Sequence, residues 1–366
     1  MSTPTAFEQE MLELINRARA NPQGEFDALI SDAAVGTAIT SNITQALAFF
    51  NVDLDLFKQQ LAGLPAAAPL AWNNNLAQAA ETHTNLMIEE DEQSHRLPGE
   101  ASLGDRVRDA GYNFNRLAEN IFAYTTDPVY GHAGFYIDWG FGPGGIQDPA
   151  GHRNAILSAS YKEIGIAAVA EANPNTQVGP YVVTQNFGSR SGYEAQLVGV
   201  AIEDFDGDVF YDAGEGLSGV TVTATGNGGT FTTTTWGSGG FQMVLPSGTY
   251  TVTFTGGGMN TTVTSTVTIG SQNVKLDAIT PTNDSDRFDG KAGNDILDLL
   301  GGNDIFAAGE GNDSVAGGGG RDTLLGGNRE DSLSGGADND LLRGGAGFDR
   351  LMGDGGNDTL YGGGQA

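Results

Sequence analysis

Apolar residues in the first half of the chain recur with two different periods. A helical period runs through residues 5–21, where the apolar positions share one face and Pro22 ends the segment. Asp148 and Pro149 are expected to start another helix, which reaches about residue 158. Further helical patterns occupy residues 31–64, 74–90 and 102–110, and strand-like apolar runs follow at 164–169 and 181–187. Residues 5–190 are therefore predicted to form one domain of mixed helices and strands.

The pattern changes to short alternating runs of Thr and Val between residues 197 and 279. The runs are residues 220–224, 230–235, 249–255 and 261–269. Glycine-rich turns separate them, and strict alternation with turn signals is typical of half-buried antiparallel strands. We expect a small all-β sandwich here, followed by a linker at residues 280–285.

In residues 286–364 an aspartate recurs every nine residues, within glycine-rich segments. The aspartates are Asp295, Asp304, Asp313, Asp322, Asp331, Asp340, Asp349 and Asp358. An apolar residue stands two positions after each of them, and these are Leu297, Phe306, Val315, Leu324, Leu333, Leu342, Leu351 and Leu360. A fixed short period shared by two residue types indicates the stacked turns of a solenoid.

Each nine-residue unit has the pattern G-G-x-G-x-D-x-L-x, which predicts a glycine-rich turn and then a short strand. The pattern is clearest in residues 344–352 and 353–361. It resembles the RTX nonapeptide repeats of secreted proteins, and the resemblance implies a parallel β-roll that binds calcium.

Two units would complete one turn of the roll, so aspartates 18 residues apart would stack in layers about 4.8 Å apart. At that spacing two carboxylates repel by roughly 1 kcal/mol even in water, and a calcium ion with oxygen ligands would remove this penalty. We therefore expect six inter-turn calcium sites and a segment that is disordered without calcium. Sites next to the irregular units, at Leu299, Leu300, Arg329 and Asp338, should be weaker or empty. A disordered Gly/Asp-rich linker is the alternative, but it gives the apolar positions no role.

The amino-acid composition excludes several classes of binding partner and of chemistry. The 366 residues carry a formal net charge of −29, which argues against nucleic acid as a partner. The chain has no cysteine, so no disulfide or thiol chemistry is expected. No apolar run approaches a membrane span, and residues 1–21 lack the apolar core of a signal peptide. The RTX resemblance implies secretion to the extracellular space by a type I route that needs no N-terminal signal peptide.

Three titratable residues of the first domain stand near loops or helix ends, where sites are commonly built: His95, Glu119 and His152. They occur among motifs in a fixed order, which are Leu14 to Arg19, Pro69 to Asn73, Leu117 to Ile121, Gly151 to Leu157, Ile164 to Ile166 and Thr184 to Phe187. Over residues 5–190 this order resembles the bacterial branch of the CAP superfamily, which includes cysteine-rich secretory, antigen 5 and pathogenesis-related proteins. The resemblance implies an α-β-α sandwich with a cleft into which His95, Glu119 and His152 project.

These three side chains allow three interpretations. Two imidazoles and a carboxylate can bind zinc with one position open, or can supply a general base. They can also form a polar cluster with neither metal nor chemistry. The fuller family site has a second glutamate near a tryptophan, whereas Trp139 is followed by Gly140 and Phe141 with no obvious carboxylate. His83, on an apolar helix face, is expected in the core, and His132 is expected in a loop near the mouth of the cleft.

The loop at residues 204–215 has a second pattern of metal ligands. Asp204, Asp206, Asp208, Asp212 and Glu215 have the ligand spacing of an EF-hand, although Val209 stands where an EF-hand has glycine. With its downstream glycines the segment resembles the B-type repeats of bacterial surface adhesins, which implies a calcium-stabilised β-sandwich. A solvated acidic turn is the alternative.

The sequence thus predicts an exported protein of three domains, at residues 5–190, 197–279 and 286–364. We expect calcium as its cofactor, possible zinc in the first domain, and a first domain that binds an extracellular lipid, peptide or glycan. A metal-assisted hydrolase or protease, and a non-catalytic surface adhesin, are the alternative functions.

Overall fold

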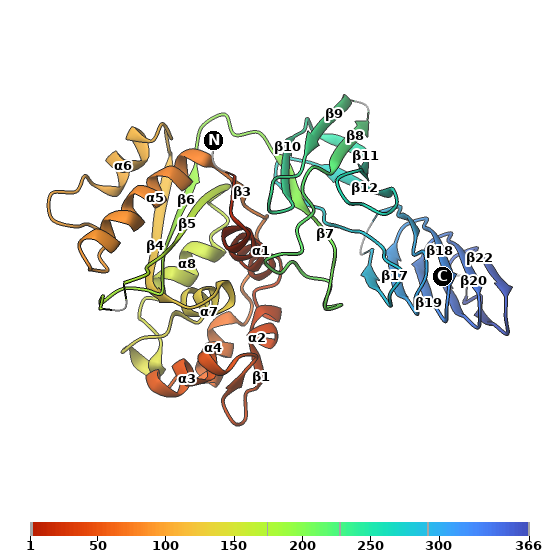
Figure 1. The fold of residues 1–366 in the computed structure, drawn as a ribbon, viewed down its shortest axis with the longest axis horizontal. Helices are drawn as coiled ribbons and strands as arrows, with labels where there is room; N and C mark the ends of the chain where they lie inside the picture. Colours follow the sequence, from red (N-terminus) through yellow and green to blue (C-terminus); the bar gives the residue numbers. More distant parts are fainter. Residues whose placement is uncertain (1–2, 174, 227, 291–292, 365–366) are drawn as a thin grey trace. The chain divides into compact units, whose positions relative to one another are not determined.

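The computed structural model describes residues 3–173, 175–226, 228–290 and 293–364. The chain divides into two compact units, residues 1–193 and 194–366, which are described separately below (Figure 1). None of the helices in these ranges combines the length and apolar character that a bilayer span requires.

A four-stranded sheet forms the middle layer of the first unit. Its order is β3 (Ala71–Trp72), β5 (Glu163–Ala170), β6 (Tyr181–Ser189) and β4 (Arg116–Thr125), so β4 is an edge strand. β3 pairs parallel with β5, and the other two pairs are antiparallel. Helix α5 (Asn74–Glu89) packs against β5 and β6, while α1 (Ala6–Ala20) and α8 (Gly151–Leu157) lie on the other side of the sheet (Figure 1). The predicted α-β-α sandwich is confirmed.

The remaining elements of this unit connect these layers. They are α2 (Gly24–Leu29), β1 (Ile30–Asp32), β2 (Thr37–Ala38), α3 (Ser41–Phe50), α4 (Leu54–Leu61), α6 (Leu103–Asp109), α7 (Pro128–Ala133), a π-helical turn at Gly134–Asp138 and a 3₁₀ turn at Pro143–Gly145. Residues 31–64, for which the sequence shows a helical pattern, thus form most of the hairpin β1–β2 and the two short helices α3 and α4. Strand β4, which carries Glu119, had no clear strand pattern because its exposed and buried positions do not alternate.

Helix α8 begins later than the sequence pattern indicated. Asp148 and Pro149 were expected as its N-cap and first turn, but the helix starts at Gly151. Its first N–H groups are instead satisfied from a distant segment, because Asp138 Oδ2 accepts from the N–H of His152 at 2.9 Å and of Arg153 at 3.4 Å. A carboxylate at a helix N-terminus satisfies orphan donors and complements the helix dipole.

The second unit starts with two packed sheets, as the predicted sandwich requires. One contains β7 (Gln196–Ile202), flanked by β10 (Gly240–Val244), β13 (Val274–Lys275) and β14 (Ala278–Ile279). The other has the order β12, β11, β8 and β9, with bounds Val263–Ile269, Gly248–Thr255, Thr221–Gly226 and Gly229–Thr234. Buried residues of both sheets belong to one hydrophobic cluster, which includes Leu197, Phe241 and Phe254.

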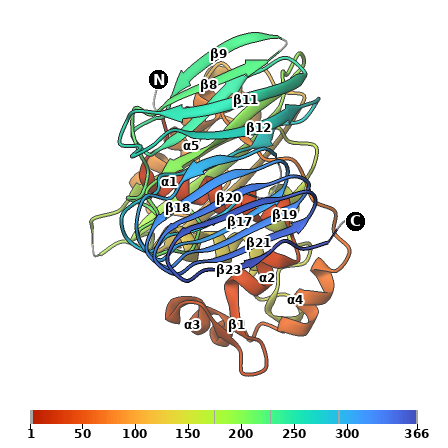
Figure 2. The ribbon, with the colours of Figure 1, turned by 90° about the vertical axis from the view of Figure 1, so that its right-hand side faces the viewer.

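The roll follows as two parallel sheets whose strands alternate along the chain. One sheet contains β15 (Arg287–Asp289), β17 (Ile305–Glu310), β19 (Thr323–Asn328), β21 (Leu341–Ala346) and β23 (Thr359–Tyr361). The other contains β16 (Ile296–Asp298), β18 (Ser314–Gly319), β20 (Ser332–Ala337) and β22 (Arg350–Gly355). Partners are 18 residues apart, as in Leu324 with Leu342, so two units make one turn (Figure 2). The predicted parallel roll is confirmed.

The sandwich and the roll share one sheet and one core. Thr264 of β12 pairs with Ile296 of β16, which joins the two parts into an eight-stranded sheet. The apolar ladder of the roll belongs to the same buried cluster as the sandwich. Residues 280–285 are correspondingly not a free linker, because Thr280 is buried and the side chain of Asn260 donates to Pro281 O at 2.7 Å.

Candidate functional site

The eight repeat aspartates lie at the two turn edges of the roll, and their carboxylates are only half satisfied. In each of the six pairs that are 18 residues apart, the backbone N–H of the earlier aspartate donates to Oδ1 of the later one, at 2.9–3.1 Å. The second oxygen, Oδ2, is buried without a hydrogen-bond partner in Asp295, Asp304, Asp313, Asp322, Asp331, Asp340 and Asp349. A buried acceptor without a partner is costly, so this row of oxygens fits a bound cation.

The turn backbone leaves room for these oxygens. A methyl group on the first glycine of the unit would lie only 2.3 Å from Oδ2 of Asp322, where the glycine is Gly317, and equally close to Asp340, where it is Gly335. The pKa of Asp295 and of Asp304 is raised from 3.8 to about 7, mainly by burial and in smaller part by neighbouring aspartates, although hydrogen bonds to the carboxylates act against the rise. The charged form is thus unfavourable without a counter-ion, and the donor set of carboxylates beside turn carbonyls suits calcium.

The ladder begins one unit earlier than the sequence pattern indicated. Asp286 precedes Asp295 by nine residues, and its backbone N–H donates to Asp304 Oδ1 at 2.8 Å. Phe288, two positions later, is buried like the other apolar members. The nine-residue period by itself could have identified Asp286 as the first member of the ladder. Its environment differs from that of the other repeat aspartates, because Thr282 donates to its carboxylate.

The irregular units adopt the backbone of the regular ones. Leu300 has φ 71°, Arg329 has φ 82° and Asp338 has φ 76°, in the left-handed region that the regular units fill with glycine. A side chain there is strained. The prediction that sites beside these turns are weaker stays a prediction.

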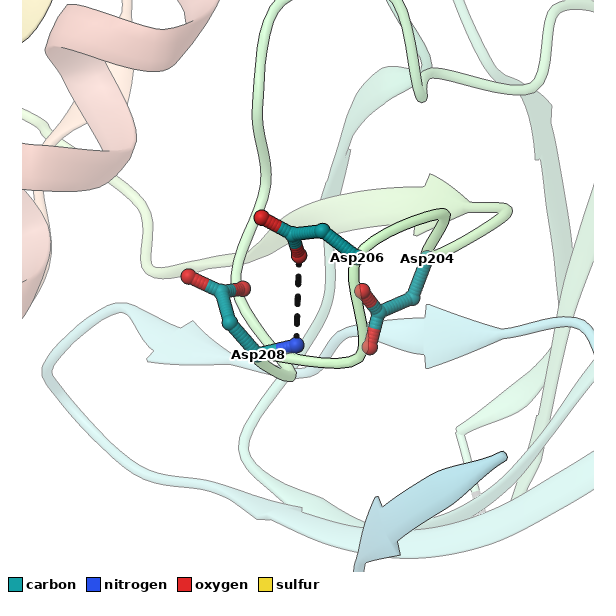
Figure 3. A group of neighbouring side chains, drawn as sticks. All are labelled: Asp204, Asp206 and Asp208. Atoms are coloured by element: carbon teal, nitrogen blue, oxygen red, sulfur yellow. Dashed lines mark hydrogen bonds between the residues drawn. The ribbon is translucent and has the colours of Figure 1, made fainter. Parts of the chain in front are cut away.

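In the second acidic loop, three of the five predicted ligand residues lie together. Asp204, Asp206 and Asp208 each offer a carboxylate oxygen, and these oxygens lie within 4.8 Å of one another (Figure 3). The carboxylates accept backbone N–H groups of the loop, as in Val209 to Asp204 at 2.9 Å and Asp208 to Asp206 at 3.2 Å. Val209, in the position where an EF-hand has glycine, has φ 64° and thus takes the glycine conformation.

Glu215 closes this loop. Its Oε1 accepts from Phe205 N at 2.9 Å and its Oε2 from Asp212 N at 2.8 Å. Burial raises the pKa of Glu215, and the carboxylates of Asp204 and Asp212 raise it further. A cation would lower this cost, which is consistent with a calcium loop.

In the first unit, Glu119 joins a cluster of ion pairs on the side of the sheet that faces α5 and α6. Its Oε1 lies 3.0 Å from His95 Nδ1, and its Oε2 accepts from Arg106 at 2.7 Å. The Glu119 side chain is 2% exposed, whereas that of His95 is 60% exposed. A buried carboxylate thus orients an exposed imidazole, whose Nε2 is free to bind.

His83 and Glu100 extend this cluster. His83 was expected as a satisfied core residue, and it is fully buried with Nδ1 2.7 Å from Glu100 Oε1. Its Nε2 lies 4.0 Å from Glu119 Oε1 and is buried without a hydrogen bond. Burial raises the pKa of Glu100, but hydrogen bonds from Leu97 N, Arg106 and His83 outweigh it and leave the pKa below its usual value. No motif in the sequence marks Glu100 or Arg106, so neither could be identified from it.

His152 has a different carboxylate partner. Its Nδ1 lies 2.8 Å from Oδ1 of Asp138, which is fully buried and has φ 62°. No carboxylate directly follows Trp139 in the sequence, but the carboxylate of Asp138 stands directly before it. A strained, buried aspartate that holds a histidine is typical of a functional site.

His132 was expected in a loop near the cleft. It is instead buried in α7, and its Nε2 lies 3.0 Å from Glu25 Oε1, where both side chains have no exposed surface. His132 is therefore a structural residue.

The two accessible histidines approach the edge strand β4 from different sides. Glu119 contacts the α5 side, whereas the next residue, Asn120, donates to Gln185 and to His152 O on the α8 side. His95, Glu119 and His152 do not offer three ligand atoms within 4.8 Å of one another, so no preformed zinc triad joins them. The arrangement is two histidine–carboxylate pairs rather than one cluster.

Comparison with family models divides the chain in the predicted order. Residues 12–187 match the model of the cysteine-rich secretory protein family. The first unit is a CAP domain. It matches this family's model although the chain has no cysteine.

The CAP domain is followed by two further matches. Residues 204–280, for which the sequence suggested a B-type repeat, match the carboxypeptidase regulatory-like domain. Residues 281–315, 316–351 and 343–366 match RTX calcium-binding nonapeptide repeats. The CAP and RTX families together indicate an extracellular calcium-binding protein.

One solved structure is similar to part of this chain. It is the 1.5 Å crystal structure of an extracellular protein containing a SCP domain from Bacillus anthracis str. Ames, with 25% sequence identity and a TM-score of 0.26. The similarity covers 40% of this chain and 39% of that one, so this chain spans well under half of that protein's length. No curated protein matches this chain.

Proposed function

We propose that this protein is an extracellular calcium-dependent binding protein whose CAP domain binds its ligand through His95 and His152. One observation carries the proposal. Each of these histidines uses Nδ1 to contact a buried carboxylate, which leaves Nε2 as the ring nitrogen for a ligand. An imidazole held in one orientation by a carboxylate is prepared to donate or accept a hydrogen bond at its other nitrogen.

A ligand screen with matched variants tests this proposal. The full chain, saturated with calcium, would be applied to arrays of peptides, glycans and lipids, next to the double variant His95→Ala/His152→Ala. We expect at least one ligand class that the wild type retains and the double variant loses. The control is Glu81→Gln, an exposed change on α5. If the double variant keeps every ligand of the wild type, the histidines are not the binding site.

A metal-assisted hydrolase is the second candidate, because the His152–Asp138 pair has the composition of a general base and its orienting carboxylate. Zinc would have to bind at the Nε2 atoms of His95 and His152, and a water molecule would act as the nucleophile. Peptide and ester hydrolysis by the wild type and by His152→Ala, with and without zinc, tests this function. Equal activity of both proteins, or no activity in either, removes it.

We also propose that the loop at residues 204–215 binds calcium through Asp204, Asp206, Asp208, Asp212 and Glu215. The sandwich shares its core with the roll, so the full chain is the proper sample. Calorimetric titration with calcium should show one site fewer in the double variant Asp206→Asn/Asp208→Asn than in the wild type. An unchanged number of sites would identify the loop as a solvated acidic turn.

In this proposal, calcium couples the folding of the roll to the extracellular space. The roll would stay unfolded at the low calcium concentration of a cytoplasm, which suits export through a type I channel, and would fold outside the cell. Circular dichroism of the full chain should lose strand signal when a chelator is added and regain it with calcium. A spectrum that the chelator leaves unchanged would refute this coupling.

A further inference from the structure

A pocket at one end of the CAP domain lies apart from both histidine pairs. It has a volume of about 640 Å³. Four segments build it: residues 73–75 at the start of α5, Arg108 near the end of α6, the loop of residues 111–115 before β4, and residues 190–191 after β6. The pocket contains Asn73, the last residue of the motif Pro69 to Asn73, and the loop of residues 111–115, which the proposed function does not use.

Three lining residues, Asn73, Tyr112 and Arg190, are joined through the buried carboxylate of Glu163, which is 1% exposed. Glu163 accepts hydrogen bonds from Tyr112 Oη at 2.8 Å, Asn73 Nδ2 at 2.9 Å and Arg190 Nε at 2.9 Å. A carboxylate with this many donors is fully satisfied and neutralised by the guanidinium. The network therefore holds these lining residues in place without making the pocket anionic.

One arginine of the lining has no buried carboxylate partner in a strongly acidic protein. The chain has 46 acidic and 17 Lys or Arg residues, and two arginines line this pocket; Glu163 neutralises Arg190, so Arg108 supplies the positive charge. The guanidinium of Arg108 lies over the ring of Phe114, with its Cζ 4.7 Å from the ring centroid. Its ion pair with Asp105, at 3.3 Å, joins two side chains that are more than half exposed, so it is weak and exchangeable. Arg108 is thus held in place and available to an anion.

The lining also carries unused amide groups. The side chains of Asn75 and Asn113 make no hydrogen bond within the described part of the chain. Asn115 and Ser191 bond only to each other, at 3.0 Å. An amide donates and accepts at neighbouring atoms, which matches the paired hydroxyl groups of a sugar. A row of amides beside an arginine therefore fits a sugar that also carries a carboxylate.

We propose that this pocket binds a uronic acid unit of an acidic polysaccharide. Arg108 would bind the carboxylate of the sugar with two parallel N–H donors, and Asn75 and Asn113 would bind its ring hydroxyls.

Calorimetric titration with two matched oligosaccharides tests the proposal. The probes are tetragalacturonic acid and its fully methyl-esterified form, which keeps the rings and hydroxyls but removes the charge. The full chain would be used at one calcium concentration throughout. We expect the acid to bind at least tenfold more tightly than the ester, and Arg108→Gln and Asn113→Ala each to weaken the acid at least tenfold.

The matched control is Arg321→Gln, which removes the same charge from an exposed position on the roll. It should leave binding unchanged, and equal melting temperatures of all variants would exclude loss of folding. Three results would overturn the proposal: no binding of the acid, equal binding of acid and ester, or binding of the acid that neither pocket variant weakens. The last result would indicate that the acid binds through calcium on the roll.

Discussion

Protonation of the repeat aspartates should stabilise the calcium-free roll. The perturbation is removal of calcium with a chelator, followed by a change of pH from about 7.5 to about 5, below the raised pKa values. Asp295 has a pKa of about 7 in the folded chain against 3.8 in the unfolded chain, and Asp304 has the same value. Folded protein therefore holds protons on these groups in a pH range where unfolded protein has released them.

The sign follows from proton linkage. A group whose pKa is raised on folding contributes stability that is fully present below pH 3.8 and is lost as the pH rises through about 7. For Asp295 the full difference is about 3 units, or about 4 kcal/mol at 1.36 kcal/mol per unit. Between pH 7.5 and pH 5 the change is about 2.5 kcal/mol. The Asp295 side chain is buried, so little solvent screening reduces this value.

Circular dichroism in chelator measures the effect. The strand signal that the chelator removes at pH 7.5 should return in part at pH 5, because the folded second unit gains about 2.5 kcal/mol or more, since Asp304 and Asp331 act in the same direction. With calcium the order should reverse, since protons compete with the metal for the same oxygens. Calcium affinity should accordingly be weaker at pH 5 than at pH 7.5.

The formal charge of −29 provides a competing explanation, because surface repulsion also weakens as carboxylates are protonated. Salt distinguishes the two. Roughly 0.5 M potassium chloride screens exposed charges but acts little on buried ones. A pH effect that disappears in salt, or a chelated protein that is no more stable at pH 5, would refute the assignment to buried aspartates.

Three single substitutions test smaller features of the second unit. Val209→Gly should raise the stability of the calcium-bound unit by about 1 kcal/mol in urea unfolding, because a β-branched residue at φ 64° is strained; a loss of stability would contradict this. Arg329→Gly should stabilise the roll by a similar amount, about 1 kcal/mol, whereas Arg321→Gly, at a position without positive φ, should not. Ser265→Ala removes a hydrogen bond to Asp295 Oδ1 and should cost about 1–3 kcal/mol at pH 7.5 in the calcium-bound protein; an unchanged melting curve would show that the sandwich does not support the first turn.

The roll is the part of the fold that the sequence determined most completely. Each unit stacks on a copy of itself 18 residues away, so the contact partner of Leu324 or Asp322 can be read from the period. Asp286 belongs to the same period, and its role followed once the register was known. Local repetition here specifies the long-range contacts.

The CAP site shows what the sequence alone left open. His95, Glu119 and His152 were identified, but their partners were not, because no motif of the sequence marks Asp138, Arg106 or Glu100. The same limit applies to the shared core of the sandwich and the roll, which depends on one strand pairing between Thr264 and Ile296. Contacts between distant, non-repeating segments depend on how whole elements pack, and only the tertiary structure decided them.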